Sequence, residues 1–128
     1  MADIIRSDIP NFTWEEIVTK CNHDDGKICP GNGTVLITDR LLDHMYMLQE
    51  LRNNIGPIRI TSGYRSPIHN KRINGAQASQ HMIFATDIIP KDYSLDSTRD
   101  LAKTIGFTCT ILYPSFLHLD LRKDAYHA

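Results

Sequence analysis

Hydrophobic residues recur every three or four positions in two stretches of the chain, which is the spacing of helices that bury one face. The stronger stretch follows Thr38, a residue type that caps helix starts, and it ends near residues 54–56. Its apolar positions are Leu41, Met45, Leu48 and Ile55. The second stretch runs from Leu95 to Thr104, with Ser94 or Asp96 as its cap. Both stretches are predicted to be helices whose apolar faces contact the core.

A shorter helix is predicted just after Thr13. Thr13 and Glu16 have the spacing of a capping box, in which each residue satisfies a backbone N–H group at the helix start. The flanking Phe12 and Ile17 can pack together as a hydrophobic staple. Residues 21–33 are rich in Asn, Asp, Gly and Pro, a composition that predicts an irregular loop.

Apolar runs predict strands in the second half of the chain. A short strand is expected at residues 58–60, and the run from Met82 to Ile89 predicts a longer strand that stops at Pro90. The runs 107–112 and 116–121 are separated by a short turn that contains proline, which predicts a hairpin. Together these elements predict an α+β fold, with a small, mostly antiparallel sheet and helices packed on one side.

The composition fits one globular domain. The 128 residues are an ordinary length for a single domain, and 41% hydrophobic with 23% charged residues is close to the average of soluble proteins. The 14 basic and 15 acidic side chains give a net charge of −1, so the chain lacks the field that would hold a nucleic acid or an anionic membrane. We expect a monomer with neither partner.

The three cysteines set the redox expectation. Cys21, Cys29 and Cys109 contain no C-x-x-C pair, which disfavours a cysteine zinc site. Cys21 and Cys29 either pair across their short loop or stay reduced. We favour the reduced state, and synthesis in the cytoplasm, because the chain starts without the apolar run of an export signal. Cys109 lies in an apolar strand and is predicted to be a buried small hydrophobe.

The candidate chemistry lies in the last predicted strand. Its alternation puts three leucines on one face and His118, Asp120 and Arg122 on the other. This polar face is either simply solvated or part of a site. His81 and Asp87 supply a second histidine and carboxylate, again after a polar turn. Imidazole nitrogens and carboxylate oxygens are zinc ligands, and three of them plus water are typical of catalytic zinc.

A shared ion requires the chain to fold back between His81 and Asp87. A fully extended segment would hold the two residues about 20 Å apart at roughly 3.3 Å per residue. No glycine lies between them to make a tight turn easy, so a bulge or turn of other residues is expected. The remaining histidines are predicted to lie on a loop, a helix surface, a short helix and a frayed tail; in this order they are His23, His44, His69 and His127.

Several segments together resemble the M15 peptidase family. They occur in the family's order and are Ile60–Pro67, Asn70, Gly75-Ala76, Ser79–His81, Asp87-Ile88 and Phe116–Arg122. The family includes zinc D-Ala-D-Ala carboxypeptidases and phage peptidoglycan endopeptidases, and the hedgehog signalling domain shares its fold. The resemblance covers about residues 12–122, the core of a single domain at residues 1–128. It implies a hedgehog/DD-peptidase-like fold, Zn²⁺ as the cofactor and the peptidoglycan stem peptide as the substrate.

The resemblance also implies roles for individual residues. The zinc ligands of the family match His81, Asp87 and His118. Arg65 would hold a carboxylate of the substrate, for which its guanidinium offers a bidentate fork, and Ser79 would assist it. Tyr64, next to Arg65 in a polar turn, is a further candidate for binding substrate. The expected activity is that of a zinc-dependent carboxypeptidase or endopeptidase in which a zinc-activated water is the nucleophile.

Two departures from the family's pattern keep alternatives open. The interval from His81 to Asp87 is one residue shorter than usual, with Phe84 near the place of a glycine. Residues 115–116 are serine and phenylalanine, where the family's catalytic acid or histidine tends to lie. Asp120 is then either the general base or a partner that fixes the last histidine, and we favour the second role.

These departures define the competing functions. One alternative is a non-catalytic phage virion or cell-wall-binding protein that keeps the fold and a structural zinc. Another is a hydrolase of a different amide with the same zinc chemistry. In the leading interpretation the protein is made in the cytoplasm of a bacterial or phage-infected cell and acts on the wall after release, or is carried in a virion.

Overall fold

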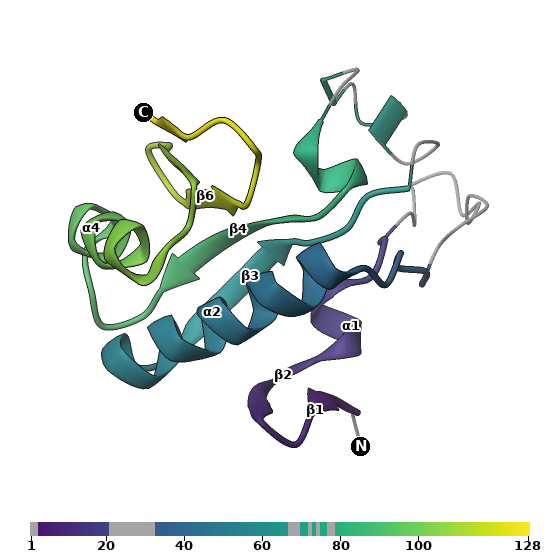
Figure 1. The fold of residues 1–128 in the computed structure, drawn as a ribbon, viewed down its shortest axis with the longest axis horizontal. Helices are drawn as coiled ribbons and strands as arrows, with labels where there is room; N and C mark the ends of the chain where they lie inside the picture. The colour runs from purple at the N-terminus through teal and green to yellow at the C-terminus, as the bar shows by residue number, and fades with distance from the viewer. Residues whose placement is uncertain (1–2, 21–32, 67–69, 72, 74, 77–78) are drawn as a thin grey trace.

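A five-stranded sheet forms the centre of the computed structural model (Figure 1), which describes residues 3–20, 33–66, 70–71, 73, 75–76 and 79–128. Its strands are β3 (Ile58–Ser62), β4 (Ala85–Pro90), β5 (Cys109–Leu112), β6 (Leu117–Asp120) and β7 (Tyr126–His127). They lie in the order β3-β4-β6-β5-β7, and every pairing is antiparallel except the parallel pairing of β5 with β7. The predicted α+β class with a small, mostly antiparallel sheet is confirmed.

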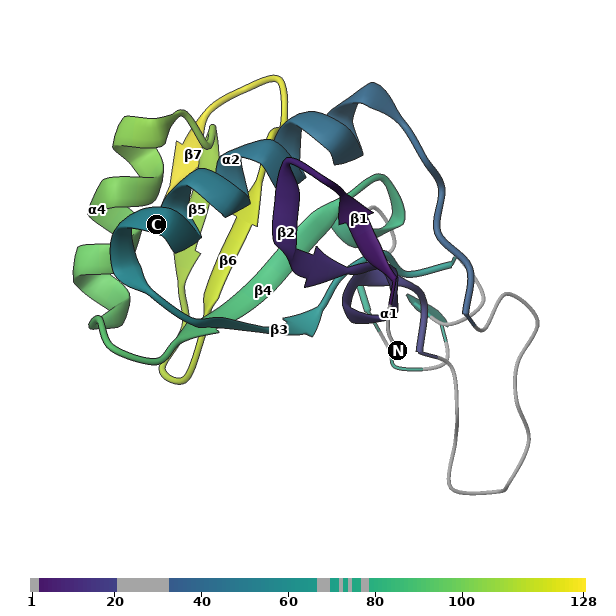
Figure 2. The same cartoon turned by 90° about the horizontal axis from the view of Figure 1, so that it is seen from below.

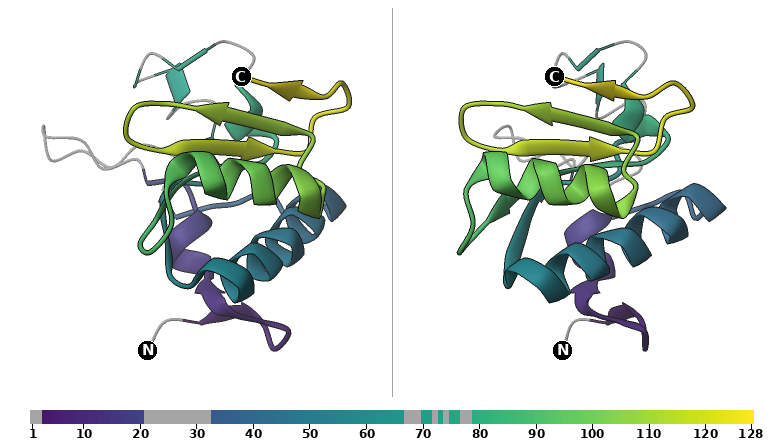
Figure 3. Two further views of the ribbon diagram at one scale, coloured as in Figure 1. Left: turned by 90° about the vertical axis from the view of Figure 1, so that its left-hand side faces the viewer. Right: turned by 60° about the vertical axis from the view of Figure 1, so that its left-hand side comes forward.

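Two long helices, α2 (Asp39–Ile55) and α4 (Leu95–Ile105), lie across one face of this sheet (Figure 2). Figure 3 shows α4 packed along β5, with α2 beside α4. The core between the helices and the sheet contains fully buried side chains from both layers, among them Leu41, Met45, Leu48, Leu51, Phe84, Ile88, Leu117 and Leu119. Burying each such side chain contributes about 1.5–3 kcal/mol. Cys109 is also fully buried, as predicted.

The predicted helix caps are present. The Thr38 hydroxyl accepts a hydrogen bond from the Leu41 backbone N–H at 3.1 Å, which satisfies one of the free donors at the start of α2. α4 is capped by Ser94, not by the alternative Asp96. α2 stops at Gly56, whose φ of 85° is a conformation that favours glycine.

A small N-terminal unit packs on the other side of α2, and the sequence analysis missed half of it. β1 (Ile4–Arg6) and β2 (Ile9–Thr13) form a hairpin, but β1 has only three residues, too few to show an alternation. The predicted short helix follows as α1 (Trp14–Ile17). Its capping box is confirmed, since the Thr13 N–H donates to Glu16 Oε1 at 2.9 Å. Phe12 and Ile17 are both buried.

Two histidine predictions are wrong. His44 is predicted to lie on a helix surface but is 0% exposed, because it faces the core, where its ring packs against Phe84 and Phe107. His127 was expected in a frayed tail but belongs to β7, where its Nδ1 lies 2.7 Å from Thr110 Oγ1 on β5. The backbone pairing of β7 with β5 accounts for the order of this segment.

The strand predicted from Met82 begins only at Ala85. Residues Gln80–Met82 instead form a short 3-10 helix, η1, which Ser79 caps through a hydrogen bond from the His81 N–H to Ser79 Oγ. The predictions for the loop at 21–33 concern mostly residues outside the described ranges, and so do those for Cys21, Cys29, His23 and His69. No helix in the described part of the chain is long and apolar enough to cross a membrane.

Candidate metal centre

Strand register brings Asp87 and His118 together. β4 and β6 are antiparallel neighbours, and Asp87 lies directly opposite His118 in their pairing. Side chains on directly opposite residues of such a pair point to the same face of the sheet. His118 Nδ1 lies 2.9 Å from Asp87 Oδ1, and both residues are 7% exposed. The interpretation of this strand face as merely solvated is therefore wrong.

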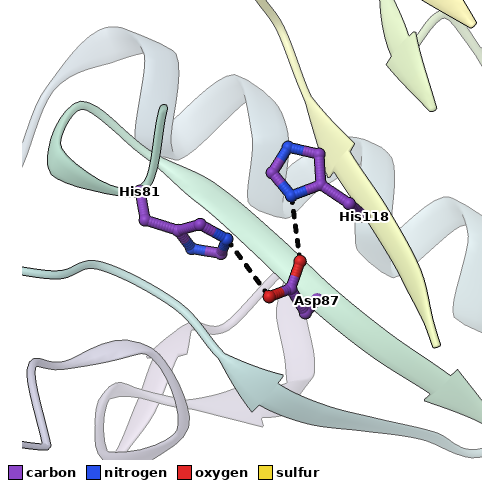
Figure 4. Close-up of side chains that lie close together, drawn as sticks. All are labelled: His81, Asp87 and His118. Carbon is purple, nitrogen blue, oxygen red and sulfur yellow. Dashed lines mark hydrogen bonds and ion pairs between the residues drawn. The ribbon is translucent and has the colours of Figure 1, made fainter. Parts of the chain in front are cut away.

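His81 joins this pair because the chain folds back without a glycine. η1 is followed by Ile83, which has helical backbone angles, and by Phe84, which is fully buried in the core. The chain then enters β4 at Ala85. His81 Nε2 comes to lie 3.2 Å from Asp87 Oδ2 (Figure 4). One short helical turn thus replaces the extended path that would have kept the two residues far apart.

The three side chains are arranged as a metal site. One ligand atom from each of His81, Asp87 and His118 lies within 4.8 Å of the others. In Figure 4 each imidazole approaches a different oxygen of Asp87, and the two ring centroids are 5.1 Å apart with planes at 72°. Zinc ligands at about 2.0–2.2 Å from the ion are themselves roughly 3–3.5 Å apart. The two nitrogen–oxygen distances to Asp87, 3.2 Å from His81 Nε2 and 2.9 Å from His118 Nδ1, are close to that range.

Each histidine makes a hydrogen bond on the side of its ring that faces away from Asp87. These hydrogen bonds fix the tautomers of the neutral rings, so that the nitrogens facing Asp87 are free to bind a cation. His81 Nδ1 is 2.7 Å from the Gly63 carbonyl oxygen, which can only accept, so Nδ1 donates and the lone pair of the neutral ring lies on Nε2. His118 Nε2 is 2.7 Å from Asp120 Oδ2 and donates to it, which leaves a lone pair on Nδ1. Both lone pairs face the carboxylate of Asp87. The lone pairs repel the negative carboxylate, and a positive ion between them removes this repulsion. Imidazole nitrogens and a carboxylate oxygen are suitable zinc ligands.

The electrostatics agree with this assignment. Without a metal ion, either imidazole can take up a second proton and donate to Asp87. Burial would raise the pKa of Asp87, but these hydrogen bonds from His118 and His81 outweigh it and lower the pKa to about 2. Asp87 is therefore ionised at neutral pH. Burial lowers the pKa of His118, yet hydrogen bonds to Asp120 and Asp87 raise it by more, so its pKa lies above the ordinary value. The surroundings of His118 thus favour positive charge.

Asp120 lies behind His118 and is already saturated. Its two oxygens accept from the Arg122 backbone N–H at 2.9 Å, from Arg122 Nε at 2.9 Å and Nη2 at 2.6 Å, and from His118 Nε2. The side chain is fully buried and lines no part of the cleft described below. Burial opposes ionisation, but the hydrogen bonds from His118 and Arg122 hold the pKa of Asp120 well below its usual range. A carboxylate this weakly basic is suited to orient His118, not to accept a proton from water.

A second cluster shares His118 but offers poorer ligands. Cys109, His118 and Asp120 also have ligand atoms within 4.8 Å of one another. Burial raises the pKa of the Cys109 thiol to about 12, so it stays protonated, whereas a metal ligand must be the thiolate. Asp120 is occupied by Arg122. The metal is therefore expected in the first cluster, between His81, Asp87 and His118, and not in the second.

Arg65 stands beside the metal centre with its guanidinium partly free. Its Nη2 lies 3.8 Å from Asp87 Oδ2, too far for a hydrogen bond, while its Nε donates to Ser62 Oγ at 3.4 Å and its Nη1 to Asn70 Oδ1 at 3.3 Å. Burial lowers the pKa of Arg65 and Asp87 opposes this, but an arginine remains charged at any physiological pH. Its backbone N–H donates to the His81 carbonyl at 2.8 Å, which holds the two residues side by side.

A cleft of about 430 Å³ opens over these residues. Arg65 and Ser79 line it together with His81, Asp87 and His118. Tyr64 is not among the described residues that line the cleft and packs against the hydrophobic core.

Part of the cleft wall was missed by the sequence analysis. Tyr113 and Phe116 line it with their rings stacked at 4.5 Å and 11°, at the end of the β5–β6 hairpin. Ile111 lines it because it lies opposite His118 in the pairing of β5 with β6. Extending the alternation of the last strand to its hairpin partner would have indicated these three positions.

A buried His–Asp–His set beside an arginine in a cleft is an arrangement typical of metal-dependent hydrolases. The comparison with protein families identifies the group within this class. The profile of the peptidase M15 family matches residues 10–120, so the chain belongs to the peptidase M15 family. The match spans the three candidate ligands and Arg65. A comparison with curated proteins found no match.

Proposed function

We propose that the protein is a zinc-dependent peptidase that cleaves the stem peptide of peptidoglycan. The observation that carries the proposal is the convergence of His81, Asp87 and His118 within 4.8 Å, with the Arg65 guanidinium 3.8 Å from the same carboxylate. Membership of the peptidase M15 family supports the peptidase activity. The protein would act as a monomer, since one chain supplies all three candidate metal ligands and Arg65.

His81, Asp87 and His118 would hold the zinc. When bound, the ion supplies a Lewis acid that activates a water molecule and polarises the scissile carbonyl. The ligand set contains one carboxylate and two neutral imidazoles, so a net positive charge remains to stabilise developing negative charge. Asp120 and the Gly63 carbonyl hold the two imidazoles in the orientation that points their lone pairs at one position.

Arg65 would bind a carboxylate of the substrate. Its guanidinium is held on one side by Ser62 and Asn70, so its direction is set before the substrate arrives. A peptide whose terminal carboxylate binds there presents its last peptide bond to the metal, which makes the protein a carboxypeptidase. A side-chain carboxylate bound at the same place makes it an endopeptidase. Tyr113 and Phe116 supply an apolar wall for the rest of the substrate.

The lining of the cleft also favours a second candidate function. Among the described residues that line it, Asp87 is the sole carboxylic acid, and it is a candidate metal ligand. Asp120 is buried behind His118 and is too weak a base. A protein that keeps the fold and a structural zinc but only binds the cell wall, such as a virion component, has the same features. In both cases the protein must reach the wall, either after release from the cell or in a virion.

One experiment separates the two candidates. The purified protein is analysed for zinc and incubated with muropeptides, and the released D-alanine and cleaved fragments are measured by mass spectrometry. The peptidase proposal expects turnover that is lost in a His118→Ala variant and in the presence of a chelator. Activity that persists under either condition overturns it. Muropeptide binding with stoichiometric zinc and no turnover favours the non-catalytic wall-binding protein.

A further inference from the structure

Arg40, in the first turn of α2, reaches the metal centre without being one of the residues that line its cleft. Its Nη2 donates a hydrogen bond to Gln80 Oε1 at 2.7 Å and lies 3.6 Å from Asp120 Oδ1. The Arg40 side chain is only 22% exposed. Burying a charged group is costly unless it is paired, so the contacts with Gln80 and Asp120 must account for an arginine at this position.

Each partner of Arg40 adjoins one of the two candidate histidine ligands. Gln80 is the first residue of η1 and directly precedes His81. Asp120 accepts the Nε2 hydrogen of His118. The two partners belong to different elements, η1 and β6, which are not paired with each other in the sheet. One guanidinium therefore joins the supports of both histidines.

Asp120 does not need Arg40 as a counter-ion. Arg122 already makes a bidentate pair with it and adds a backbone N–H donor. The distinct contribution of Arg40 is thus its link to Gln80. Arg40 also has a cost, because its Nε is buried with no hydrogen-bond partner among the described residues and loses its contact with water. An apolar side chain of similar length would avoid this cost but could not form the link to Gln80.

The next turn of α2 supports the third ligand in the same way. His44 lies four residues after Arg40, on the same helix face. Its Nε2 is 2.8 Å from Thr86 Oγ1, and Thr86 directly precedes Asp87. Two side chains of α2 thus support all three candidate ligands. Arg40 contacts Gln80, which precedes His81, and the Asp120 carboxylate, which holds His118. His44 contacts Thr86, which precedes Asp87.

We infer that Arg40 is a positioning residue of the metal centre, which fixes the separation of His81 and His118 by joining Gln80 to Asp120. The inference rests on the proposed zinc site. Arg40 touches neither the metal position nor the cleft, so its effect is on the geometry and affinity of the ligand set. Loss of a residue that supports metal ligands in this way typically weakens metal binding tenfold to a hundredfold.

The test measures metal binding directly. Arg40→Met removes the charge and both contacts while keeping most of the side-chain volume, and Arg99→Met is the matched control. Arg99 lies on α4, has a 29% exposed side chain and does not line the cleft. Its buried Nε has no hydrogen-bond partner among the described residues and lies 3.8 Å from Asp100 Oδ1. Zinc affinity is measured by competition with a chromogenic chelator, and the absorption spectrum of the Co²⁺-loaded protein reports the ligand geometry.

We expect Arg40→Met to bind zinc at least roughly tenfold more weakly and to change the cobalt spectrum, while Arg99→Met matches the wild type. Gln80→Leu breaks the same link from the other side and should cause a similar loss. The double variant should show little additional loss, because the two residues act through one contact.

The outcomes are separable. If Arg40→Met does not fold, Gln80→Leu decides alone. Wild-type zinc affinity and an unchanged cobalt spectrum in the folded variants overturn the inference while leaving the proposed function intact. A wild-type protein that binds neither zinc nor cobalt overturns both. If the wild type binds zinc but shows no peptidase activity, weaker zinc binding by the Arg40 and Gln80 variants still supports the inference, and only the proposed reaction is overturned.

Discussion

Replacing Asp120 with asparagine is expected to weaken zinc binding while leaving the side-chain shape unchanged. Four donors converge on the two oxygens of Asp120: three N–H groups of Arg122 and the Nε2–H of His118. Asparagine offers one acceptor oxygen, and its NH₂ group must replace the other. In one orientation the NH₂ group faces His118 Nε2 and Arg122 Nη2, and in the other it faces the backbone N–H and Nε of Arg122.

The structure sets the size of both effects. Loss of the carboxylate that orients a metal-binding histidine costs about tenfold to a hundredfold in affinity, or about 1.4–2.7 kcal/mol. Removing one partner of a buried ion pair costs about 3–5 kcal/mol of the unfolding free energy. Arg122 and Arg40 are 26% and 22% exposed, so water relieves part of their lost pairing. We therefore expect the lower end, about 3 kcal/mol.

Two assays check this prediction. Chelator competition gives the zinc affinity, and urea unfolding of the metal-free protein gives the stability. Asp124→Asn, at an exposed position shortly after the same strand, controls for the loss of one negative charge. If Asp120 were the general base, its asparagine variant would keep zinc affinity and lose only turnover. Zinc affinity within about twofold of the wild type would therefore refute the orienting role.

Three further predictions use other residues. Burial lowers the pKa of His44 from 6.5 to about 3, so below pH 6.5 the unfolded chain takes up a proton that the folded chain does not. The unfolding free energy should fall by about 2–3 kcal/mol between pH 6.5 and about 4.5 in the wild type and by much less in His44→Leu, as urea titrations at each pH will show; equal slopes would contradict this. Arg65→Lys should raise KM about tenfold with zinc affinity unchanged, because lysine lacks the bidentate fork; an unchanged KM would contradict this. Phe84→Ala should lower the unfolding free energy by about 3–5 kcal/mol, and a loss below about 1 kcal/mol would contradict its burial.

The sequence was sufficient where a local rule decides the structure. The Thr38 and Ser94 caps follow from side-chain chemistry at helix starts, and both are present. The period of two in the last strand put His118 and Asp120 on one face, opposite the leucines, and the register of β6 on β4 gave that face a partner. The polar face could thus be expected from the alternation, whereas the set of three ligands was expected from the resemblance to the peptidase M15 family.

The sequence was insufficient where the structure depends on neighbours distant in the chain. His44 lies on the same helix face as Leu41 and Leu48, but a polar ring is accommodated in the core there only through residues distant in the chain. Its ring packs against Phe84 and Phe107, and its Nε2 lies 2.8 Å from Thr86 Oγ1. Tyr64 adjoins Arg65 in sequence but packs against the core, because backbone bonds to Ile17 and His81 turn the two residues in different directions. The contact of Arg40 with Gln80 joins two elements whose relative position no local pattern encodes.

The burial of Phe84 has a consequence for how this chain tolerates changes in length. Surface loops usually accept an inserted residue at small cost. The segment from Met82 to Ala85 can do so only if its turn is rebuilt, because Phe84 is anchored in the core while the candidate ligands His81 and Asp87 lie just before and just after the segment. One added residue either draws Phe84 out of the core or shifts His81 against Asp87 by roughly 3.3 Å, far more than the roughly 0.2 Å tolerance of a metal–ligand bond. An insertion scan of the whole chain should find this segment among the least permissive, and the turn at residues 113–115 far more tolerant.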